Sequence, residues 1–342
     1  MTRLERRLGL GSGVVLALLV VYLVWGSTYL AIRFAIETLP TFSMAGMRFL
    51  IAGAALYLWA RAQGAPPPRR AHWLPSFGIG ALLLLGGNGA VVWSEHRIPS
   101  GIAALVVAVE PVAIALLAPL ILGHRRPGLR AVAGLTAGVA GVAILVVDPR
   151  GLDPTSVDLA GTLAVVLGAL SWALGSLWSV RAALPESRAM ASALQMLLGG
   201  ALLLGAGGLA GEWSRWSFEQ TSLRSLVAFG YLVVFGSIVA FSAYAYLMRA
   251  APPNVASTYA FVNPVVAVLL GWLVAGEPLN WRVGVSSVLI LAAVATMILS
   301  ESRGRRDGAS VRVRAESPSV AAPTDDGEPV AAAVAESGCR TA

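Results

Sequence analysis

A 26-residue apolar segment with a proline near its middle occurs twice in this chain, at residues 98–123 and 251–276. Aligned without a gap, the two copies match at two prolines, at the closing glycine and at several apolar positions between them. Proline removes a backbone N–H and clashes with the carbonyl four residues back, so each copy is expected to be a helix that breaks, at Pro111 and at Pro264. Matching broken helices are typical of transporters built from two repeats, although proline kinks are also common in ordinary membrane helices.

The composition is that of a membrane protein. Of the 342 residues, 57% are hydrophobic and 13% are charged, with a mean hydropathy of +0.74, whereas soluble domains carry about 25% charged residues. The 25 basic residues are all arginines, found mainly in short loops between apolar runs. We therefore interpret the net charge of +7 as a topology signal and expect no nucleic-acid partner. The single Cys339 and three scattered histidines lack metal-ligand spacing, so no metal or other cofactor is expected.

Ten apolar runs predict an all-α polytopic membrane protein with ten transmembrane helices, because each run is long enough to cross a bilayer. The expected helices are 13–32, 41–60, 74–93, 98–123, a glycine-rich helix ending at 147, 159–180, 189–210, 223–248, 251–276 and 281–300.

The arginines predict the orientation of these helices. With ten crossings, 18 arginines lie on the side of both termini and six lie on the opposite side, which places both termini in the cytoplasm of a bacterial inner-membrane protein. Five helices per half is an odd number, so the second half is expected to be inverted relative to the first. The predicted organisation is a cytoplasmic N-terminus (1–12), a first repeat (13–147), an extracytoplasmic linker (148–158), a second repeat (159–300) and a disordered cytoplasmic tail (301–342).

Three stretches resemble a known family. They are VWGSTYLAIR at 24–33 followed by MRFL at 47–50, the Glu-Pro pair at 110–111, and FVNPVVAVLLGWLVAGEPLNWRVGVSSVLILAAVATMIL at 261–299. Together they resemble the EamA family of the drug/metabolite transporter superfamily, over about residues 14–299. The resemblance implies two inverted five-helix repeats with a cavity between them. It also implies export of amino acids, nucleobases, sugars or other small metabolites and drugs.

Glu110 is the first candidate for a transport role, because an ionisable side chain within the membrane is costly and is a functional-site hypothesis by default. Its carboxyl group could bind a cationic part of a substrate or take up a proton as the coupling ion. Arg48 is the expected partner. At about 1.5 Å per residue, the two side chains lie about 10 and 16 Å from the same membrane face, which is compatible with an ion pair. A purely structural pair is the alternative.

Polar and aromatic residues of the apolar helices complete the predicted site. Asn263 holds the position of Glu110 in the second repeat and could bond a substrate or the carbonyl freed by Pro264. The remaining substrate-binding candidates are Trp25, Ser27, Thr28, Tyr29, Trp172, Ser176, Tyr244 and Tyr259. Aromatic surfaces suit planar or cationic substrates, whereas small hydroxyl residues equally serve helix packing.

Two further groups receive a structural interpretation. Four ionisable residues fall at expected helix ends, where hydration makes a charge inexpensive, and no role in substrate binding is expected for Glu95, His96, Glu277 and Arg282. A glycine pattern in the fifth helix indicates close helix packing or a homodimer contact, at Gly134, Gly138 and Gly141.

The sequence thus predicts a secondary active transporter that exports a small molecule by alternating access, with a proton as candidate coupling ion. A membrane-embedded enzyme is a weaker hypothesis, because the chain has no clustered ligands and no nucleophile beside a base. A nucleotide-driven pump would require a GxxxxGK[ST] loop, which the sequence lacks. A sensor or scaffold acting through the C-terminal tail is the remaining alternative.

Overall fold

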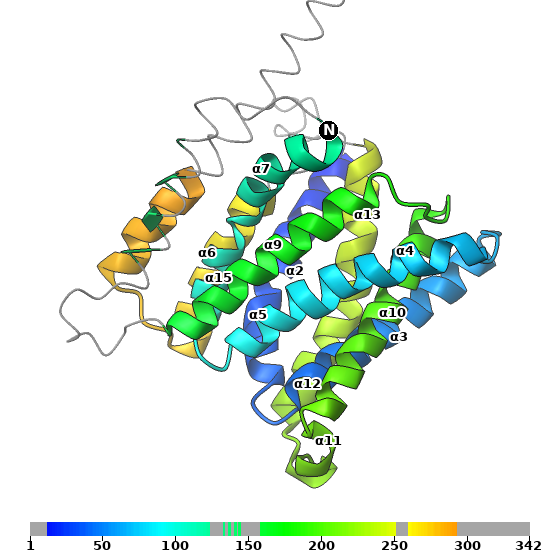
Figure 1. The fold of residues 1–342 in the computed structure, drawn as a ribbon. Coiled ribbons are helices and arrows are strands. Elements are labelled where there is room, and N and C mark those ends of the chain that lie inside the picture. Colours follow the sequence, from blue (N-terminus) through cyan, green and yellow to red (C-terminus); the bar gives the residue numbers. More distant parts are fainter. Residues whose placement is uncertain are drawn as a thin grey trace, which may run out of the picture. The chain divides into compact units, whose positions relative to one another are not determined.

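The computed structural model describes residues 12–123, seven residues between 133 and 144, residues 158–250 and residues 259–292, and every regular element within them is helical (Figure 1). Six helices there are long and apolar enough to cross a membrane: Ser12–Ala35, Thr41–Ala62, Arg70–Ser94, Leu159–Ser179, Arg188–Leu209 and Leu223–Tyr244. Two shorter apolar helices are Val262–Ala275 and Trp281–Ala292. The predicted all-helical membrane fold is therefore confirmed.

The total of ten transmembrane helices stays a prediction. Most of the expected fifth helix, residues 251–258 and the end of the expected tenth helix lie outside the described residues. The predicted N-terminal segment, extracytoplasmic linker and C-terminal tail also lie there, apart from single residues at their edges.

The elements follow the apolar runs of the sequence closely. In chain order they are α2 (Ser12–Ala35), α3 (Thr41–Ala62), α4 (Arg70–Gly80), η1 (Ala81–Asn88), α5 (Gly89–Ser94), α6 (Ser100–Val107), α7 (Glu110–Leu122), α9 (Leu159–Ser179), α10 (Arg188–Leu209), α11 (Glu212–Arg215), η2 (Phe218–Gln220), α12 (Leu223–Tyr231), η3 (Leu232–Val239), α13 (Ala240–Ala250) and α15 (Tyr259–Ala275). Side chains cap the starts of three long helices: Asp158 accepts from Gly161, Ser187 from Met190 and Ser222 from Ser225. Such caps satisfy backbone N–H groups that have no partner within the helix.

Helices α3 and α10 lie in close contact, and glycines allow the approach. A Cβ atom at Gly46 would lie 2.7 Å from the backbone nitrogen of Leu204 and 2.8 Å from the carbonyl oxygen of Gly200. A Cβ at Gly53 would lie 3.0 Å from the backbone nitrogen of Leu197. Small residues at a crossing let two membrane helices pack backbone against backbone. The contact joins the second expected helix of one predicted repeat to the second of the other.

Two π-helical segments interrupt otherwise α-helical spans at corresponding places. In η1 the N–H of Gly89 bonds to the carbonyl of Leu84, five residues back, and in η3 the N–H of Ala240 bonds to that of Phe235. These segments lie in the third expected helix of the first predicted repeat and the third of the second. π-Helical turns are rare and occur frequently at functional sites, so both segments mark places to search for a site.

The first proline-containing segment breaks as predicted. Helix α6 ends at Val107, Ala108 and Val109 form a turn, and α7 begins at Glu110 with Pro111 as its second residue. Proline is favourable at this position because the first N–H groups of a helix have no intrahelical partner to lose.

The second segment does not break at its proline. Helix α15 is continuous from Tyr259 to Ala275 with Pro264 inside it, so the prediction of a break at Pro264 is wrong. Pro264 has no N–H, so the helix lacks one backbone hydrogen bond there. Packing against α2 keeps this part of α15 helical. A Cβ at Gly26 of α2 would lie 2.6 Å from Cβ of Val266 and 3.2 Å from the carbonyl oxygen of Asn263. Tertiary contact therefore supports the turn that contains the proline.

Gly141 makes its close contact within this chain. A Cβ added there would lie 2.8 Å from Cγ1 of Ile290, in the helix Trp281–Ala292. This glycine thus serves helix packing inside the protein, while Gly134 and Gly138 lie outside the described residues.

Candidate functional site

Four aromatic side chains from α2, α13 and α15 pack into one group, which we call the aromatic cluster: Trp25, Phe241, Tyr244 and Tyr259. The ring centroid of Trp25 lies 5.7 Å from that of Phe241, 5.2 Å from that of Tyr244 and 5.4 Å from that of Tyr259. The ring centroids of Tyr244 and Tyr259 are 5.7 Å apart in an edge-to-face arrangement. Trp25, Tyr244 and Tyr259, three of the predicted residues, thus meet in one place.

The cluster is attached to the π-helical segment η3. The indole Nε1 of Trp25 donates to the carbonyl of Gly236 at 3.2 Å. Two residues further along α2, the hydroxyl of Ser27 is hydrogen-bonded at 2.6 Å to that of Tyr231, the last residue of α12. A Cβ at Gly236 would lie 3.0 Å from Cγ2 of Thr28. Glycine at this point therefore allows α2 to approach η3 closely enough for the indole to reach its backbone.

Glu110 lies near the aromatic cluster. As the first residue of α7 it follows directly on the break in the fourth helix, and its side chain is partly buried. Its carboxyl group is close enough to act electrostatically on the phenol groups of Tyr29, Tyr244 and Tyr259. Glu110 thus lies within electrostatic range of tyrosines from both predicted repeats.

Arg48 does not pair with Glu110 in the part of the chain that the structure describes. Its Nε donates to the hydroxyl of Ser237 at 2.8 Å, and its guanidinium lies 4.9 Å from the ring centroid of Phe49. The expected ion pair is therefore not formed in this conformation. Depth along the membrane does not tell which side of α3 faces which neighbour, and Arg48 turns towards Ser237 of η3.

The remaining predicted residues are divided among three places. Asn263 is buried, and its Oδ1 has no hydrogen-bond partner within the described ranges. The hydroxyl of Thr28 donates to the carbonyl of Trp25 in the same helix. Trp172 of α9 packs on η1, where a Cβ at Gly87 would lie 2.8 Å from its ring. Ser176 follows one turn later on α9, where its carbonyl accepts from the hydroxyl of Ser179.

Two carboxylates from the second predicted repeat cap helices of the first. Glu212 accepts from the backbone N–H of Phe42 at 2.9 Å and of Ser43 at 2.8 Å, at the start of α3. Glu277 accepts from the N–H of Ser100 at 2.7 Å and of Gly101 at 3.0 Å, at the start of α6. A carboxylate at a helix N-terminus is stabilised by the free N–H groups and by the helix dipole. We call the end of the bundle that holds both caps the capped end; α11 and α12 lie there, in the lower part of Figure 1.

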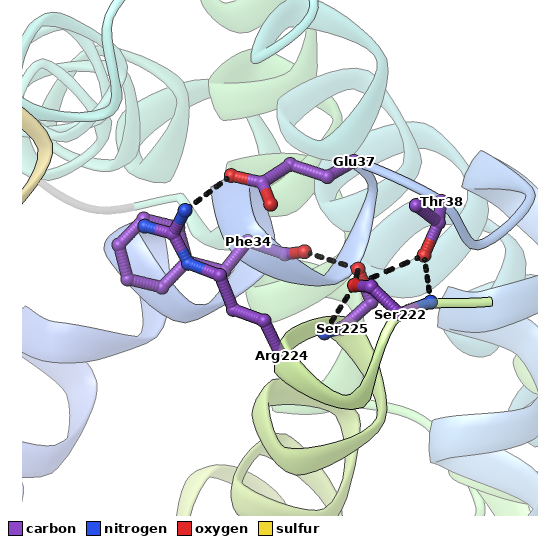
Figure 2. Close-up of polar contacts among 6 residues, drawn as sticks. All are labelled: Phe34, Glu37, Thr38, Ser222, Arg224 and Ser225. Atoms are coloured by element: carbon purple, nitrogen blue, oxygen red, sulfur yellow. Dashed lines mark hydrogen bonds and ion pairs between the residues drawn. The ribbon is translucent and has the colours of Figure 1, made fainter.

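A further polar contact at the capped end joins α2 to α12 (Figure 2). The hydroxyl of Ser225 donates to the carbonyl of Phe34 at 2.7 Å, and the N–H of Ser222 donates to Thr38 Oγ1 at 3.0 Å. Arg224 pairs with Glu37 at 3.3 Å, and its guanidinium lies 3.6 Å from the ring centroid of Phe34. All these contacts cross between the two predicted repeats.

Glu95 is completely buried at the capped end, contrary to the expectation that it is solvated. Its Oε1 and Oε2 have no hydrogen-bond partner among the residues described. Burial raises the pKa of its carboxyl group well above the usual range; the carboxylate of Glu277 adds to the rise, and Arg33 opposes it. The expectation failed because Ser94, Ile98 and Ser100 around it are also buried, so the connection between α5 and α6 lies within the protein. Arg282 is likewise buried.

The sequence did not indicate the part that η3 plays. Tyr231, Gly236, Ser237 and Phe241 lie in what reads as a single apolar helix, and the only signal is the adjacent Gly-Ser pair within it. For metals, no group of three or more His, Cys, Asp or Glu side chains lies close enough to share an ion in the described part of the chain.

Comparison with known proteins agrees with the fold and the repeats. Residues 11–147 and 159–299 each match the EamA-like transporter family. The chain is 40% identical to YedA of Escherichia coli K12, an uncharacterized inner membrane transporter, over 289 residues that cover 83% of this chain and 90% of YedA. It is 27% identical to PagO of Salmonella typhimurium, over 82% of this chain and 90% of PagO, and 28% identical to PecM of Dickeya dadantii, over 79% and 87%.

One crystal structure of a protein 20% identical in sequence superposes with a TM-score of 0.57, covering 84% of this chain and 98% of the other; at this identity the likeness concerns the fold alone. The two family matches together cover most of the chain, and the similarity to YedA extends over nearly the same residues. This chain therefore belongs to the EamA-like transporter family and is a multi-pass inner-membrane transporter.

Proposed function

We propose that the protein is a secondary active exporter of a small organic molecule, and that the aromatic cluster together with Glu110 binds the substrate. Residues 13–147 and 159–300 would form two inverted five-helix repeats, with both termini in the cytoplasm and the capped end facing outwards. The arginine distribution supports this orientation. The two family matches and the pair of π-helical segments at corresponding positions support the repeats.

The observation that carries the proposal is the meeting of aromatic rings and a carboxyl group at the broken helix. Trp25 belongs to the first predicted repeat and Tyr244 and Tyr259 to the second, while Glu110 approaches from the start of α7. Substrate sites of transporters built from inverted repeats lie between the repeats, at interrupted helices. Indole and phenol faces attract cationic groups, and a carboxylate adds charge complementarity. A substrate with an amino group or another cationic part fits this arrangement.

Alternating access requires contacts between the repeats that form at one end and release. The caps made by Glu212 and Glu277, and the contact between Arg224 and Glu37, have this character, since each joins one predicted repeat to the other. We propose that they hold the capped end closed while the aromatic cluster is reached from the cytoplasm. In this scheme Glu110 binds either the cationic substrate or a proton, which would couple export to the proton gradient.

The proposal is tested by comparing metabolites inside and outside cells that express wild type, Glu110→Gln, Trp25→Ala or the empty vector at matched membrane levels. A compound exported by wild type and not by the two variants would identify the substrate and support the site. As a matched control, Trp59→Ala removes an exposed tryptophan from α3 and should leave export unchanged. Equal export by wild type and Glu110→Gln would remove the carboxyl group from the transport path.

The alternative of a tail-operated sensor has a direct test. A chain truncated after Arg306 lacks nearly all of the predicted tail. An exporter should retain its flux after truncation, whereas a sensor or scaffold acting through the tail should lose its effect on the cell. Light scattering of the purified protein, with the contribution of detergent subtracted, gives its molar mass and distinguishes a monomer from a homodimer.

A further inference from the structure

Glu95 presents an unusual combination of burial and missing partners. Its side chain is fully buried, and neither carboxyl oxygen has a hydrogen-bond partner within the described residues. A buried carboxylate without partners is far more costly than a buried neutral acid, so this environment suits the protonated form. The carboxylate of Glu277 lies close enough to act on Glu95 electrostatically. It is held in place by three donors from Ser100 and Gly101, and a second negative charge beside it is unfavourable.

A positive charge lies near Glu95 but is not used by its carboxyl group. Arg33 on α2 donates through Nη1 to the backbone carbonyl of Glu95 at 2.5 Å, and no ion pair between the two side chains forms in the part that is described. The other groups around Glu95 are Tyr29 of α2 and, on its own segment, His96 and Arg97. His96 is bonded to Thr41 and Arg97 to Asp158.

We propose that Glu95 is a proton-binding site, occupied while the capped end is closed and vacated when that end opens. The O–H bond of the neutral acid breaks on opening, its proton passes to water that enters there, and the resulting carboxylate is stabilised by water and by the nearby Arg33. Closing reverses the step: a proton returns from water and the acid is again buried beside Glu277. Closure of the capped end thereby takes up one proton at a site separate from Glu110.

The inference rests on the proposed opening of the capped end. Its first part, that Glu95 is protonated while the capped end is closed, can be tested without the substrate. Infrared spectra of the purified protein at pH 7 detect the carbonyl band of a protonated carboxylic acid. We expect wild type to have such a band, Glu95→Gln to lose it, and Glu219→Gln, which changes an exposed carboxylate on η2, to retain it. The spectrum of Glu110→Gln shows how much of the carbonyl band comes from a protonated Glu110. An unchanged band in Glu95→Gln would overturn the assignment and leave the exporter proposal standing.

A disulfide trap tests the link to closure. Ser222 and Thr38 contact each other through their hydroxyl groups at 3.4 Å (Figure 2), so Thr38→Cys with Ser222→Cys, in a chain with Cys339→Ser, should cross-link when the capped end is closed. The rate is measured from pH 6 to pH 8 with Glu95 and again with Glu95→Gln, which mimics the neutral acid. The second series corrects for the pH dependence of thiol chemistry.

We expect the cross-linking rate of the Glu95 chain, relative to the Glu95→Gln chain, to fall several-fold as pH rises through this range. A ratio that is constant with pH would show that the proton on Glu95 is not linked to closure and would overturn the proposal. If the ratio of cross-linking rates falls with pH but no exported compound is found, the result counts against the exporter hypothesis alone.

Discussion

Arg48 and Ser237 are joined by a hydrogen bond of 2.8 Å between a guanidinium Nε and a hydroxyl, and both residues are buried. Ser237 in turn donates to the carbonyl of Leu232 at 3.1 Å, within the π-helical segment η3. The bond connects α3 of the first predicted repeat to the segment of the second that also receives the indole of Trp25. Arg48 thus stabilises η3, the segment to which Trp25 of the candidate site is bonded, and does so without pairing with Glu110.

Replacing Ser237 with alanine should destabilise the protein. The substitution leaves a buried guanidinium N–H without its acceptor, and such a loss costs about 1–3 kcal/mol. Thermal unfolding in detergent measures the effect. The matched control is Ser242→Ala, which removes an exposed hydroxyl that donates to the carbonyl of Ile238 one turn earlier; its unfolding temperature should stay close to that of wild type. Equal shifts for the two variants would contradict the role assigned to the Arg48–Ser237 bond.

Exchanging the charges of Arg48 and Glu110 should not restore folding. Each single reversal places the wrong charge among groups arranged for the original one, and the two side chains do not pair in the described conformation. The double variant Arg48→Glu with Glu110→Arg is therefore expected to be no better folded than the worse single variant. Gel filtration of the detergent-solubilised protein gives the folded fraction. A double variant that recovers the wild-type profile would reinstate the ion pair.

Changing Trp25 to phenylalanine should weaken substrate binding while keeping an aromatic ring in the cluster. The variant loses the hydrogen bond to Gly236 and part of the π surface, and cation–π contacts contribute about 0.5–2 kcal/mol. We expect KM for export to rise about 2- to 30-fold with kcat changed less. Trp59→Phe, at an exposed position of α3, is the control. Identical KM values in the two variants would argue against the aromatic cluster as the binding surface.

Removing the two carboxylate caps should destabilise the capped end in an additive way. Loss of an N-terminal cap costs about 0.5–2 kcal/mol, and Glu212 and Glu277 cap different helices, α3 and α6. Glu212→Ala and Glu277→Ala should each lower the unfolding temperature, with a double variant near the sum, because sites without shared partners behave independently. Glu219→Ala provides the exposed control. A single-variant effect no larger than that of Glu219→Ala would contradict the capping role.

The stability of the protein should depend on pH through Glu95. Burial raises the folded-state pKa of this carboxyl group above its unfolded value, so the stabilising effect of the neutral acid is fully present below about pH 4.3 and is lost as pH rises towards the folded-state pKa. Over that window the loss is about 1.4 kcal/mol per pH unit at most. The glutamine of Glu95→Gln cannot ionise, so this variant should not show the loss of stability with rising pH. Chemical unfolding of both proteins between pH 5 and 8 gives the difference, and a difference independent of pH would contradict the burial of an acid.

The places of the described membrane-spanning helices could be predicted from the sequence because hydropathy decides which runs of about 20 residues can cross a bilayer. The runs at 41–60, 159–180 and 189–210 differ from the observed helices by two residues or fewer at each end. The break before Pro111 was predictable for a similarly local reason, since a proline and its neighbours determine which backbone bonds are lost. The family was recognisable from short motifs that extend over both repeats.

Which side chains meet was decided by tertiary structure. A proline in the same place interrupts the helix at Pro111 but not at Pro264. The difference arises because α2 packs through Gly26 against the helical turn that contains Pro264. The orientation of α3 about its own axis places Arg48 against Ser237. The folding of the connection between α5 and α6 into the protein buries Glu95, although its place at a helix end suggested water. Hydropathy and local backbone chemistry act along the chain, whereas pairing and burial depend on how each helix is turned towards its neighbours, and that is settled only when the helices pack.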